Sequence, residues 1–469
     1  MTILAIDQGT TSTRALLVDA RGARVLMART HAQHYPRPGW VEHDGEELLA
    51  NVRACLAAAA GLGVQAVGIA NQGESCLGWD AQTGVPVGPV IVWQDDRTAD
   101  VTDRLRAEGC EPIVQAAAGL PLDPYFSAAK LAWILGENRE AQRLHGLGRL
   151  RLGTTDAFFR DRLAGRFETD VTTASRTSLM NLAAKDWDPA LCALFGVPRE
   201  CLPAITATTG DLGTVGGLAL TASVVDQQAA LHGHGCRRPG DAKITFGTGA
   251  FALALTGGLR AAEGVLPTVA WARSGEEAVH AVDGGVYAAS AAVNWARGLG
   301  LFGDWTEIDS FDAEPAIARG IAFVPALSGL ACPHWDRRAR GAWMGLGLDT
   351  APRDMAQAVL EGVAFRMAEV IARMAQIVPL SGPVSIDGGM SANPWFCGFL
   401  SGALGRPVMV SDEPELTAVG TAELAAHGAG IALEVQRRGR MVAAEPVPPE
   451  WYARFAAARA AVQGYGAAE

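Results

Sequence analysis

Two short turns rich in glycine and threonine, each lying between apolar runs, most constrain the fold of this chain. The first, Asp7-Gln8-Gly9-Thr10-Thr11-Ser12-Thr13-Arg14, joins the apolar residues 3–6 to 15–18. The second, Gly247-Thr248-Gly249, joins residues 244–246 to 250–253. Apolar runs on both sides of a glycine turn predict a β-hairpin. Because similar hairpins stand near the starts of two similar-sized halves, we predict a duplicated α/β fold.

The first turn has the chemistry of an anion site. Gly9 lets backbone N–H groups approach a phosphate closely. Further donors come from the hydroxyls and the guanidinium of Thr10, Thr11, Ser12 and Arg14. Asp7, at the end of the preceding strand, is placed to hold a metal-bound water. The P-loop pattern G-x-x-x-x-G-K-[ST] is absent from the sequence. An ordinary hairpin turn with solvated hydroxyls is an equally open interpretation of the turn alone.

Length and composition limit the class of protein. A chain of 469 residues is too long for one ordinary core, so we predict two domains, residues 1–238 and 239–469, divided where Arg, Pro and Gly cluster. The net charge of −11 argues against nucleic acid as a partner. The eight cysteines show no metal-ligand spacing, and neither a leader peptide nor an apolar run of 18 residues is found. We therefore expect a soluble, cytoplasmic protein that binds no membrane; its oligomeric state is left open, a homodimer included.

Two later motifs carry candidate chemistry. Asp226 follows the apolar residues 223–225, and strand ends face the ligand crevice of an α/β sheet. A carboxylate there suits a general base that accepts a proton from a hydroxyl attacking phosphorus. A helix N-cap is the alternative reading of Asp226. Gly389 and Asn393 follow a strand and open a helix, where they suit contacts to a base or ribose; tight packing is the alternative.

Three further residues suggest a polyol pocket. Glu74, Trp93 and Tyr125 lie at the ends of three separate extended segments. Aromatic rings pack on C–H faces and a carboxylate accepts hydroxyl protons, which together describes a site for a small polyol. From spacing alone, membership of the hydrophobic core is the more economical reading of the Trp and the Tyr.

Ordered blocks along the whole chain resemble the FGGY carbohydrate kinases, and within that family the glycerol kinases. The resemblance is carried by residues 35–44, Ile91-Val92-Trp93-Gln94, Asp123-Pro124-Tyr125-Phe126-Ser127, Ala174-Ser175-Arg176-Thr177 and Trp335-Asp336. The second family signature is complete between Gly341 and Glu361. The first is present from Tyr125 to Trp133 but lapses at Gly136, where a polar residue is usual.

The resemblance implies a two-domain actin/hexokinase-like (ribonuclease H-like) α/β fold with ATP in an interdomain cleft, and Mg²⁺-ATP-dependent phosphorylation of a small polyol or sugar. It makes Asp226 the general base and assigns the acceptor to Glu74, Trp93, Tyr125, Asp226 and Gln227. It assigns ATP to Thr10, Thr11, Ser12, Arg14, Thr248, Ser290, Asn294, Gly389 and Asn393. It places Mg²⁺ near Asp7 and Asp226, through water. Ser290 and Asn294 stand where the family has Gly and Gln.

One departure from the family concerns the acceptor. Glycerol kinases carry Asn-Gln-Arg-Glu where this chain has Asn71-Gln72-Gly73-Glu74. Loss of a charged hydrogen bond to a substrate hydroxyl costs about 1.5–3 kcal/mol. Glycerol is therefore one candidate acceptor, and a pentulose (xylulose or ribulose) or a tetritol such as erythritol is the alternative. An actin-like ATPase switch or a catalytically inactive sensor are more remote alternatives. The loop at 216–221 lacks the arginine of the fructose bisphosphate-binding motif.

Overall fold

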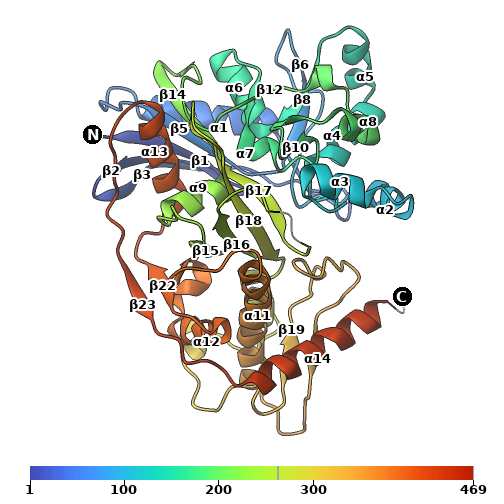
Figure 1. Cartoon of the computed structure of the whole chain (residues 1–469), viewed down its shortest axis with the longest axis vertical. Helices are drawn as coiled ribbons and strands as arrows, with labels where there is room; N and C mark the ends of the chain where they lie inside the picture. The colour runs from blue at the N-terminus through green and yellow to red at the C-terminus, as the bar shows by residue number, and fades with distance from the viewer. Residues whose placement is uncertain (261–262, 468–469) are drawn as a thin grey trace. The chain divides into compact units, whose positions relative to one another are not determined.

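The computed structural model describes residues 1–260 and 263–467, which form two compact units (Figure 1). The first unit contains residues 1–235, 267–280 and 415–436. The second contains residues 236–266, 281–414 and 437–469. The chain passes from one unit to the other more than once, because each unit is made of three separate stretches. The predicted division at 238/239 has a single crossing, and it stays a prediction.

The first unit is built on a six-stranded sheet of order β13-β14-β5-β1-β2-β3. β1 (Ile3–Gln8) and β2 (Ser12–Asp19) form the first predicted hairpin, and β3 (Gly22–Thr30) extends it to an antiparallel meander. β5 (Val67–Asn71) runs parallel to β1, and β14 (Leu218–Val225) runs parallel to β5. β13 (Thr214–Val215) closes the edge. Because three parallel strands end at the same edge, the residues that follow β1, β5 and β14 are neighbours.

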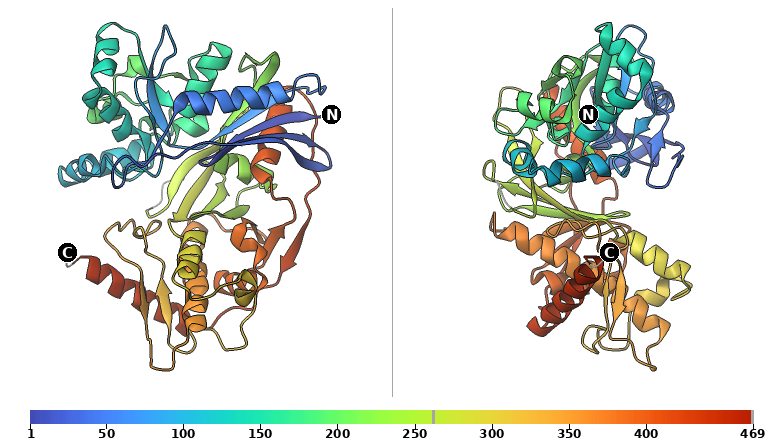
Figure 2. Two further views of the ribbon diagram at one scale, coloured as in Figure 1. Left: turned by 180° about the vertical axis from the view of Figure 1, so that it is seen from behind. Right: turned by 90° about the vertical axis from the view of Figure 1, so that its right-hand side faces the viewer.

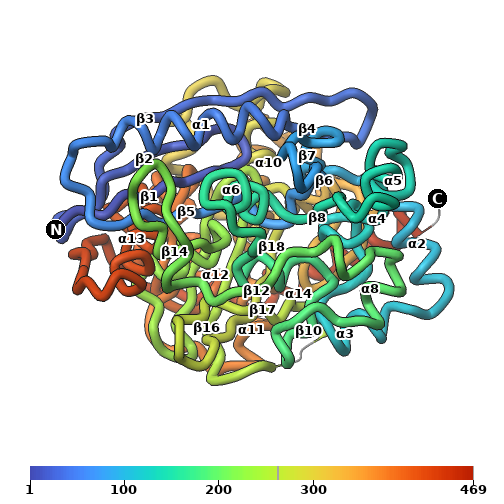
Figure 3. The backbone as a smooth tube through the Cα atoms, turned by 90° about the horizontal axis from the view of Figure 1, so that it is seen from above, coloured from blue at the N-terminus to red at the C-terminus, as the bar shows by residue number. Residues whose placement is uncertain are grey.

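Helices cover both faces of this sheet. α1 (Gly45–Ala58) and α6 (Thr155–Ala164) bury Leu48, Val52 and Phe158 against Ile6 and Ile69. In Figure 3, α1 runs lengthwise along the hairpin strands. Alternate residues of a strand point to opposite faces, and α13 (Leu416–Gly428) packs on the other face together with α9 (Asp226–Gly233).

The remaining elements of the first unit form a smaller α/β layer. It holds a four-stranded sheet of order β4-β7-β6-β8: β4 (Glu42–His43), β7 (Val90–Ile91), β6 (Cys76–Asp80) and β8 (Leu150–Thr154). Its helices are α2 (Ala99–Ala107), α3 (Glu111–Ala118), α4 (Ser127–Glu137), α5 (Arg139–Gly146), α7 (Val171–Ala174) and α8 (Pro189–Phe195). Short pairs are β9 (Glu168–Asp170) with β12 (Ala204–Thr206) and β10 (Met180–Asn181) with β11 (Asp186–Trp187); β17 (Leu266–Trp271) belongs here from its second residue onward.

The crossing of α9 and α13 depends on two glycines. A Cβ atom built on Gly420 would lie 1.8 Å from the carbonyl oxygen of Ala229, and one built on Gly233 would lie 1.9 Å from that of Leu416. Neither backbone can move aside without separating the helices. Since α9 begins at Asp226, the crossing also fixes the helix that carries this predicted base.

We expect Gly420→Ala to destabilise the protein strongly. Overpacking a buried contact costs about 1–3 kcal/mol and more where backbone opposes backbone, so the thermal transition should fall by several degrees. Gly136→Ala is the matched control, because a Cβ on this glycine of α4 meets nothing within 4 Å. Its transition should stay unchanged or rise slightly. Equal transitions for both variants, measured by calorimetry, would show that the α9–α13 crossing tolerates separation.

The second unit repeats the topology of the first. β15 (Ala242–Phe246) and β16 (Ala250–Thr256) form the second predicted hairpin, and β21 (Val384–Gly388) runs parallel to β15 as β5 does to β1. β22 (Val408–Ser411) extends the sheet in parallel, β23 (Gly439–Val442) pairs with it in antiparallel orientation, and β18 (Val279–Val286) lies on the far side of β16. The repeated arrangement confirms the predicted duplication at the level of topology.

Long helices bury the core of this unit. α11 (Pro352–Ala375) contacts α12 (Pro394–Leu404), and α14 (Pro449–Gly466) contacts β19 (Ala322–Val324) (Figure 2). α10 (Ser290–Gly298) and β20 (Ala342–Met344) complete it. Gly362 lets α11 approach β19, since a Cβ there would lie 2.1 Å from the Phe323 carbonyl oxygen.

Candidate active site

The first hairpin turn is held in a fixed conformation by main-chain contacts. The Gly9 N–H donates to the Ser12 carbonyl over 3.0 Å. The ring of buried His31 contacts the Thr10 carbonyl through Nε2 at 2.9 Å, and its backbone N–H donates to the Thr11 carbonyl at 3.3 Å. Burial lowers the pKa of His31, so the ring is neutral at pH 7. The side chain of Thr11 is exposed, and those of Thr10 and Ser12 are half-buried, which leaves hydroxyls available to a ligand.

Arg14 and Asp7 are paired with each other in the structure. Nη2 of Arg14 lies 2.6 Å from Oδ2 of Asp7, and Nη1 lies 2.7 Å from Oε2 of Glu415. Burial lowers the pKa of Arg14, but Asp7 and Glu415 outweigh it and leave the pKa above its ordinary value. A guanidinium between two carboxylates is less free for phosphate than the sequence suggests, and Glu415 is a partner that sequence reasoning missed. The phosphate role of Arg14 stays a prediction.

Asp7 and Asp226 lie at one edge of the six-stranded sheet. Gln8, Asn71 and Val225 are in register across β1, β5 and β14, so Asp7 and Asp226 flank that row. Two strand spacings separate their backbones by about 10 Å. Mg²⁺ keeps several waters and uses one or two carboxylates, so this pair fits a hydrated Mg²⁺. In the described residues, no group of three or more His, Cys, Asp or Glu side chains is arranged to hold a metal ion.

Glu74 is buried next to an arginine. Its Oε1 accepts a hydrogen bond of 2.7 Å from Nε of Arg176, and both side chains are nearly inaccessible. The Glu74 backbone has φ = 59°, and its carbonyl accepts a 2.8 Å hydrogen bond from the hydroxyl of Ser127. A non-glycine residue in the left-handed region is uncommon and concentrates at functional sites. The left-handed backbone at Glu74 directs its carboxylate toward Arg176, whereas an extended backbone at this position would direct the side chain elsewhere.

Trp93 and Tyr125 form an aromatic corner near Glu74. Their ring centroids are 5.7 Å apart at an interplanar angle of 75°, and the Arg176 guanidinium lies 5.9 Å from the Tyr125 centroid. Nε1 of Trp93 donates to the hydroxyl of Thr10 over 3.0 Å. The structure therefore brings the predicted polyol pocket and the predicted phosphate turn together. Tyr125 precedes α4 and is not at a strand end.

Gly73 directly precedes Glu74 in the chain. A Cβ built on it would lie 3.2 Å from Cγ1 of Val225, a tight contact that a small shift of the Val225 side chain would relieve. Arg97 is held away from this position: its side chain is fully buried, binds Asp95 and Glu42 at 2.7 Å, and lies over the Trp40 ring at 3.8 Å. Arg97 therefore does not supply the guanidinium that Gly73 lacks.

The short helix α7 contacts two of the predicted acceptor segments, a function that the sequence did not reveal. Oγ1 of Thr172 accepts a 3.0 Å hydrogen bond from the backbone N–H of Val225, the residue before Asp226. The Thr173 hydroxyl donates to Oδ1 of Asn71 at 3.3 Å. Asp170, fully buried, caps the helix and accepts a hydrogen bond from the Thr172 hydroxyl. The one available signal was the family block at 174–177, immediately after this helix.

Asp226 and Gln227 open α9 in half-buried positions. Oδ1 of Asp226 accepts a 2.7 Å hydrogen bond from the N–H of Gln227. The N-cap of α9 is Val225 and not Asp226. The carboxylate of Asp226 is thus placed at the sheet edge, half accessible, as a proton acceptor must be.

In the second unit, the turn at Thr248 leads to α10. The Thr248 carbonyl accepts hydrogen bonds from the N–H groups of Ala289 and Ala291 at 3.0 and 3.1 Å, and Ser290 N–H donates to the Gly247 carbonyl at 3.2 Å. The side chain of Thr248 is exposed. The second hairpin and the helix that begins at Ser290 are therefore one rigid corner.

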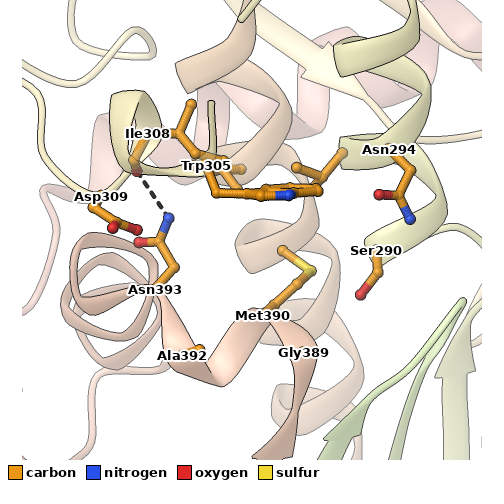
Figure 4. Close-up of a pocket in the computed structure, with 11 residues that line it drawn as sticks. Ser290, Asn294, Trp305, Ile308, Asp309, Gly389, Met390, Ala392 and Asn393 are labelled. Atoms are coloured by element: carbon orange, nitrogen blue, oxygen red, sulfur yellow. Dashed lines mark hydrogen bonds between the residues drawn. The ribbon is translucent and has the colours of Figure 1, made fainter. Parts of the chain in front are cut away.

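Four predicted nucleotide residues line one pocket of the second unit, which has a volume of about 440 Å³ (Figure 4). These residues are Ser290, Asn294, Gly389 and Asn393. Asn393 also caps α12, accepting from Phe396 N–H at 2.8 Å, while its Nδ2 donates to the Ile308 carbonyl at 2.8 Å. An apolar cavity with a few convergent polar groups is the usual form of a ligand site.

The same pocket contains residues that the sequence analysis missed. Trp305, Asp309 and Met390 also line it, and Figure 4 shows the Trp305 ring and the Met390 side chain facing one another. Trp305 belongs to a short 3₁₀ helix (Trp305–Ile308), and the Arg297 guanidinium lies 5.0 Å from its ring centroid. No periodic pattern marks this stretch, so only the structure reveals it.

Comparison with known proteins decides the family. The model of the FGGY family of carbohydrate kinases, N-terminal domain, matches residues 2–225, and that of the C-terminal domain matches residues 242–429. The chain belongs to the FGGY family of carbohydrate kinases. It is similar to glycerol kinase from Citrifermentans bemidjiense, with 41% identity over 92% of this chain and 90% of the relative.

Solved structures agree with this assignment. Plasmodium falciparum glycerol kinase with ADP has a TM-score of 0.89 and 27% identity, over 99% of this chain and 98% of the other. Xylulose kinase from Lactobacillus acidophilus has a TM-score of 0.87 at 20% identity, over 100% and 99%, which shows the fold alone. The FGGY kinase described here thus has the predicted actin/hexokinase-like fold and is an ATP- and Mg²⁺-dependent phosphotransferase with an alcohol acceptor, acting on a small polyol or sugar.

Proposed function

We propose that this FGGY kinase transfers the γ-phosphoryl group of ATP to a hydroxyl of a polyol or ketose with three to five carbons. The observation that supports this most directly is the cluster of Glu74, Trp93 and Tyr125 beside the Thr10 turn. A buried carboxylate with two aromatic rings matches hydroxyls and C–H faces, and the adjoining hydroxyl turn suits phosphate.

The chain's own residues divide the work of this reaction. Asp226 accepts the proton of the attacking hydroxyl, Glu74 orients the acceptor, and the hydroxyls of the Thr10 turn and Thr248 bind phosphate oxygens. Asp7 and Asp226 hold Mg²⁺ through water; when bound with ATP, the cation neutralises charge on the phosphate oxygens. The pocket at Gly389 and Asn393 takes the adenosine.

The acceptor itself is suggested by two observations that favour different compounds. Gly73 carries no side chain where the glycerol kinases have an arginine, which favours a four- or five-carbon acceptor. The relatives at 41% identity carry the name glycerol kinase, which favours glycerol as the second candidate. Kinetics of ADP release with glycerol, erythritol, xylulose and ribulose test both. We expect the highest kcat/KM with a four- or five-carbon compound; ATP hydrolysis that no small polyol or ketose stimulates would reject the proposed function.

A cytoplasmic location is part of this proposal. All eight cysteines are free thiols, and seven of them are buried, which suits a reducing compartment. Within residues 1–260 and 263–467, we find no helix with the length and apolarity needed to cross a bilayer.

A further inference from the structure

Lysine is almost absent from this chain. Of its 39 basic side chains only three are lysines, at positions 130, 185 and 243, and all the others are arginines. The side chain of Lys130, on α4, is fully buried. Arginine carries a wide, permanently charged fork, whereas lysine carries a compact ammonium that can lose its proton. A lysine kept inside an arginine-rich protein suggests that this site needs the smaller cation.

The ammonium of Lys130 joins the two aromatic segments of the acceptor pocket. Nζ donates to the main-chain carbonyl of Tyr125 over 2.9 Å and to that of Trp93 over 3.3 Å. The two residues that carry these carbonyls are 32 positions apart in the sequence. Trp93 lies just after β7, and Tyr125 lies just before α4. A buried charge is costly unless polar groups surround it, and here the polar groups are the backbones of the two residues whose rings form the aromatic corner.

Several ionisable groups surround Nζ. Burial lowers the pKa of Lys130 to about 8. Four neighbouring ionisable residues act in the opposite direction and raise this pKa: Cys76 on β6, Asp95 after β7, Glu74 before β6 and Asp123 before α4. Asp95 is paired with Arg97 and Glu74 with Arg176. Burial also raises the pKa of Cys76 to about 12, so its thiol stays neutral.

We propose that Lys130 is a positioning residue of the acceptor pocket, whose ammonium fixes the backbones of Trp93 and Tyr125 and so the spacing of their rings. This inference rests on the proposed function, because it takes the corner of Trp93 and Tyr125 as the acceptor site. The class of ligand concerned is the uncharged small polyol or ketose.

The charge on Lys130 then controls acceptor affinity. An ammonium attracts both carbonyl dipoles and has three N–H donors, whereas a neutral amine has two and no net charge. As the pH rises through about 8, the two segments lose their common cation and the acceptor KM increases.

The contribution of Lys130 to the stability of the fold changes with pH in the opposite sense to its effect on acceptor affinity. Its folded pKa lies below the unfolded value, so the unfolded chain binds more protons above pH 8 and stability rises with pH there. Loss of acceptor affinity is therefore separable from unfolding.

The scarcity of lysine makes a direct measurement feasible. Protein labelled with ¹³C at lysine Cε should give three lysine signals, and the one missing in Lys130→Gln belongs to Lys130. We expect this signal to titrate near pH 8 and to move to a higher pKa with saturating acceptor, because ligand and proton affinities are linked. In wild-type kinetics the acceptor KM should rise about tenfold between pH 7 and pH 9.5, while the KM for ATP stays within twofold.

Variants complete the test. Lys130→Gln and Lys130→Met should show a high acceptor KM that no longer depends on pH, with kcat within a few-fold of wild type. Lys243→Met removes the other fully buried lysine, on β15, and should leave the acceptor KM unchanged. If the Lys130 variants do not fold, judged by ADP binding, the wild-type titration and KM profile still decide. A flat acceptor KM, or a Lys130 signal that titrates like that of an exposed lysine, overturns the proposal.

The failure of this proposal is distinguishable from failure of the proposed function. Trp93→Ala should raise the acceptor KM if the aromatic corner is the acceptor site. If Trp93→Ala has no effect, the site itself is wrong. If Trp93→Ala raises the KM and both Lys130 variants behave as wild type, only the role of Lys130 is wrong.

Discussion

Asp226→Asn should lower kcat by about 10²- to 10⁴-fold, the usual cost of losing a general base, and leave ADP affinity within a few-fold. The carboxylate is half-buried at the edge of the six-stranded sheet, where β14 ends, and the helix behind it is locked by the Gly233–Gly420 crossing. The amide of asparagine preserves shape and can still accept the hydrogen bond from Gln227 N–H, so the loss should be chemical and not structural.

Pre-steady-state kinetics with the best acceptor measure this effect, and calorimetric titration measures ADP affinity. Asp211→Asn is the matched control, because the Asp211 side chain is 82% exposed, pairs with surface Arg166 over 3.1 Å and accepts a 3.0 Å hydrogen bond from the Gly213 N–H that an asparagine can also accept. It should retain wild-type kcat. Turnover of Asp226→Asn at the wild-type rate would assign proton acceptance to another group.

Local patterns were sufficient to predict both hairpins and the strand that precedes the candidate base. The turns at Gly9 and Gly247 lie between apolar runs, and their pairing partners are the next residues of the chain, so no distant information was needed. The same holds for Asp226, whose position after an apolar strand is visible in eight consecutive residues. These elements place the candidate phosphate turn and the candidate base before any tertiary contact is known.

Contacts between distant segments could not be predicted in this way. Glu415 pairs with Arg14 across 401 positions, and Arg176 reaches Glu74 across 102. Arg97 lies four positions after Trp93 in the sequence, and this proximity alone would suggest it as a substitute for the arginine missing at position 73. The structure instead encloses Arg97 between Trp40 and Trp133. Which arginine faces which carboxylate is decided by tertiary packing.

The two candidate sites also differ in how many of their residues could be predicted from the sequence. The acceptor corner was predicted from Glu74, Trp93 and Tyr125, but the residues that hold it, Lys130 and Thr172, have side chains that read as parts of ordinary helices. In the pocket of the second unit, Trp305 lies on a single 3₁₀ turn. A turn this short has no hydrophobic period, so composition and pattern carry no information about it.

Gly73→Arg should reverse the acceptor preference. The position accepts a side chain once Val225 shifts slightly, since its φ is outside the left-handed region and a Cβ would lie 3.2 Å from Cγ1 of Val225. A new guanidinium beside Glu74 would donate to hydroxyls of a short acceptor and fill the volume that a longer one needs. A site that pairs a hydroxyl discriminates strongly, and one without the partner does not. We expect kcat/KM for glycerol to rise about tenfold to a hundredfold, the worth of one charged hydrogen bond, and activity on xylulose or erythritol to fall.

Two further variants separate charge from bulk. Gly73→Ala adds only a Cβ and should keep the wild-type preference, whereas Gly73→Leu fills the space without a donor and should lose the longer acceptors without any gain for glycerol. If the wild-type kinase already uses glycerol with a micromolar KM and ignores four- and five-carbon acceptors, another side chain supplies the missing donor. Arg176 is then the residue to examine, because its Nε already binds the carboxylate of Glu74 and its guanidinium lies by the Tyr125 ring. Replacing Gly73 would in that case crowd the pocket and lower glycerol kcat/KM, the opposite of the change expected here.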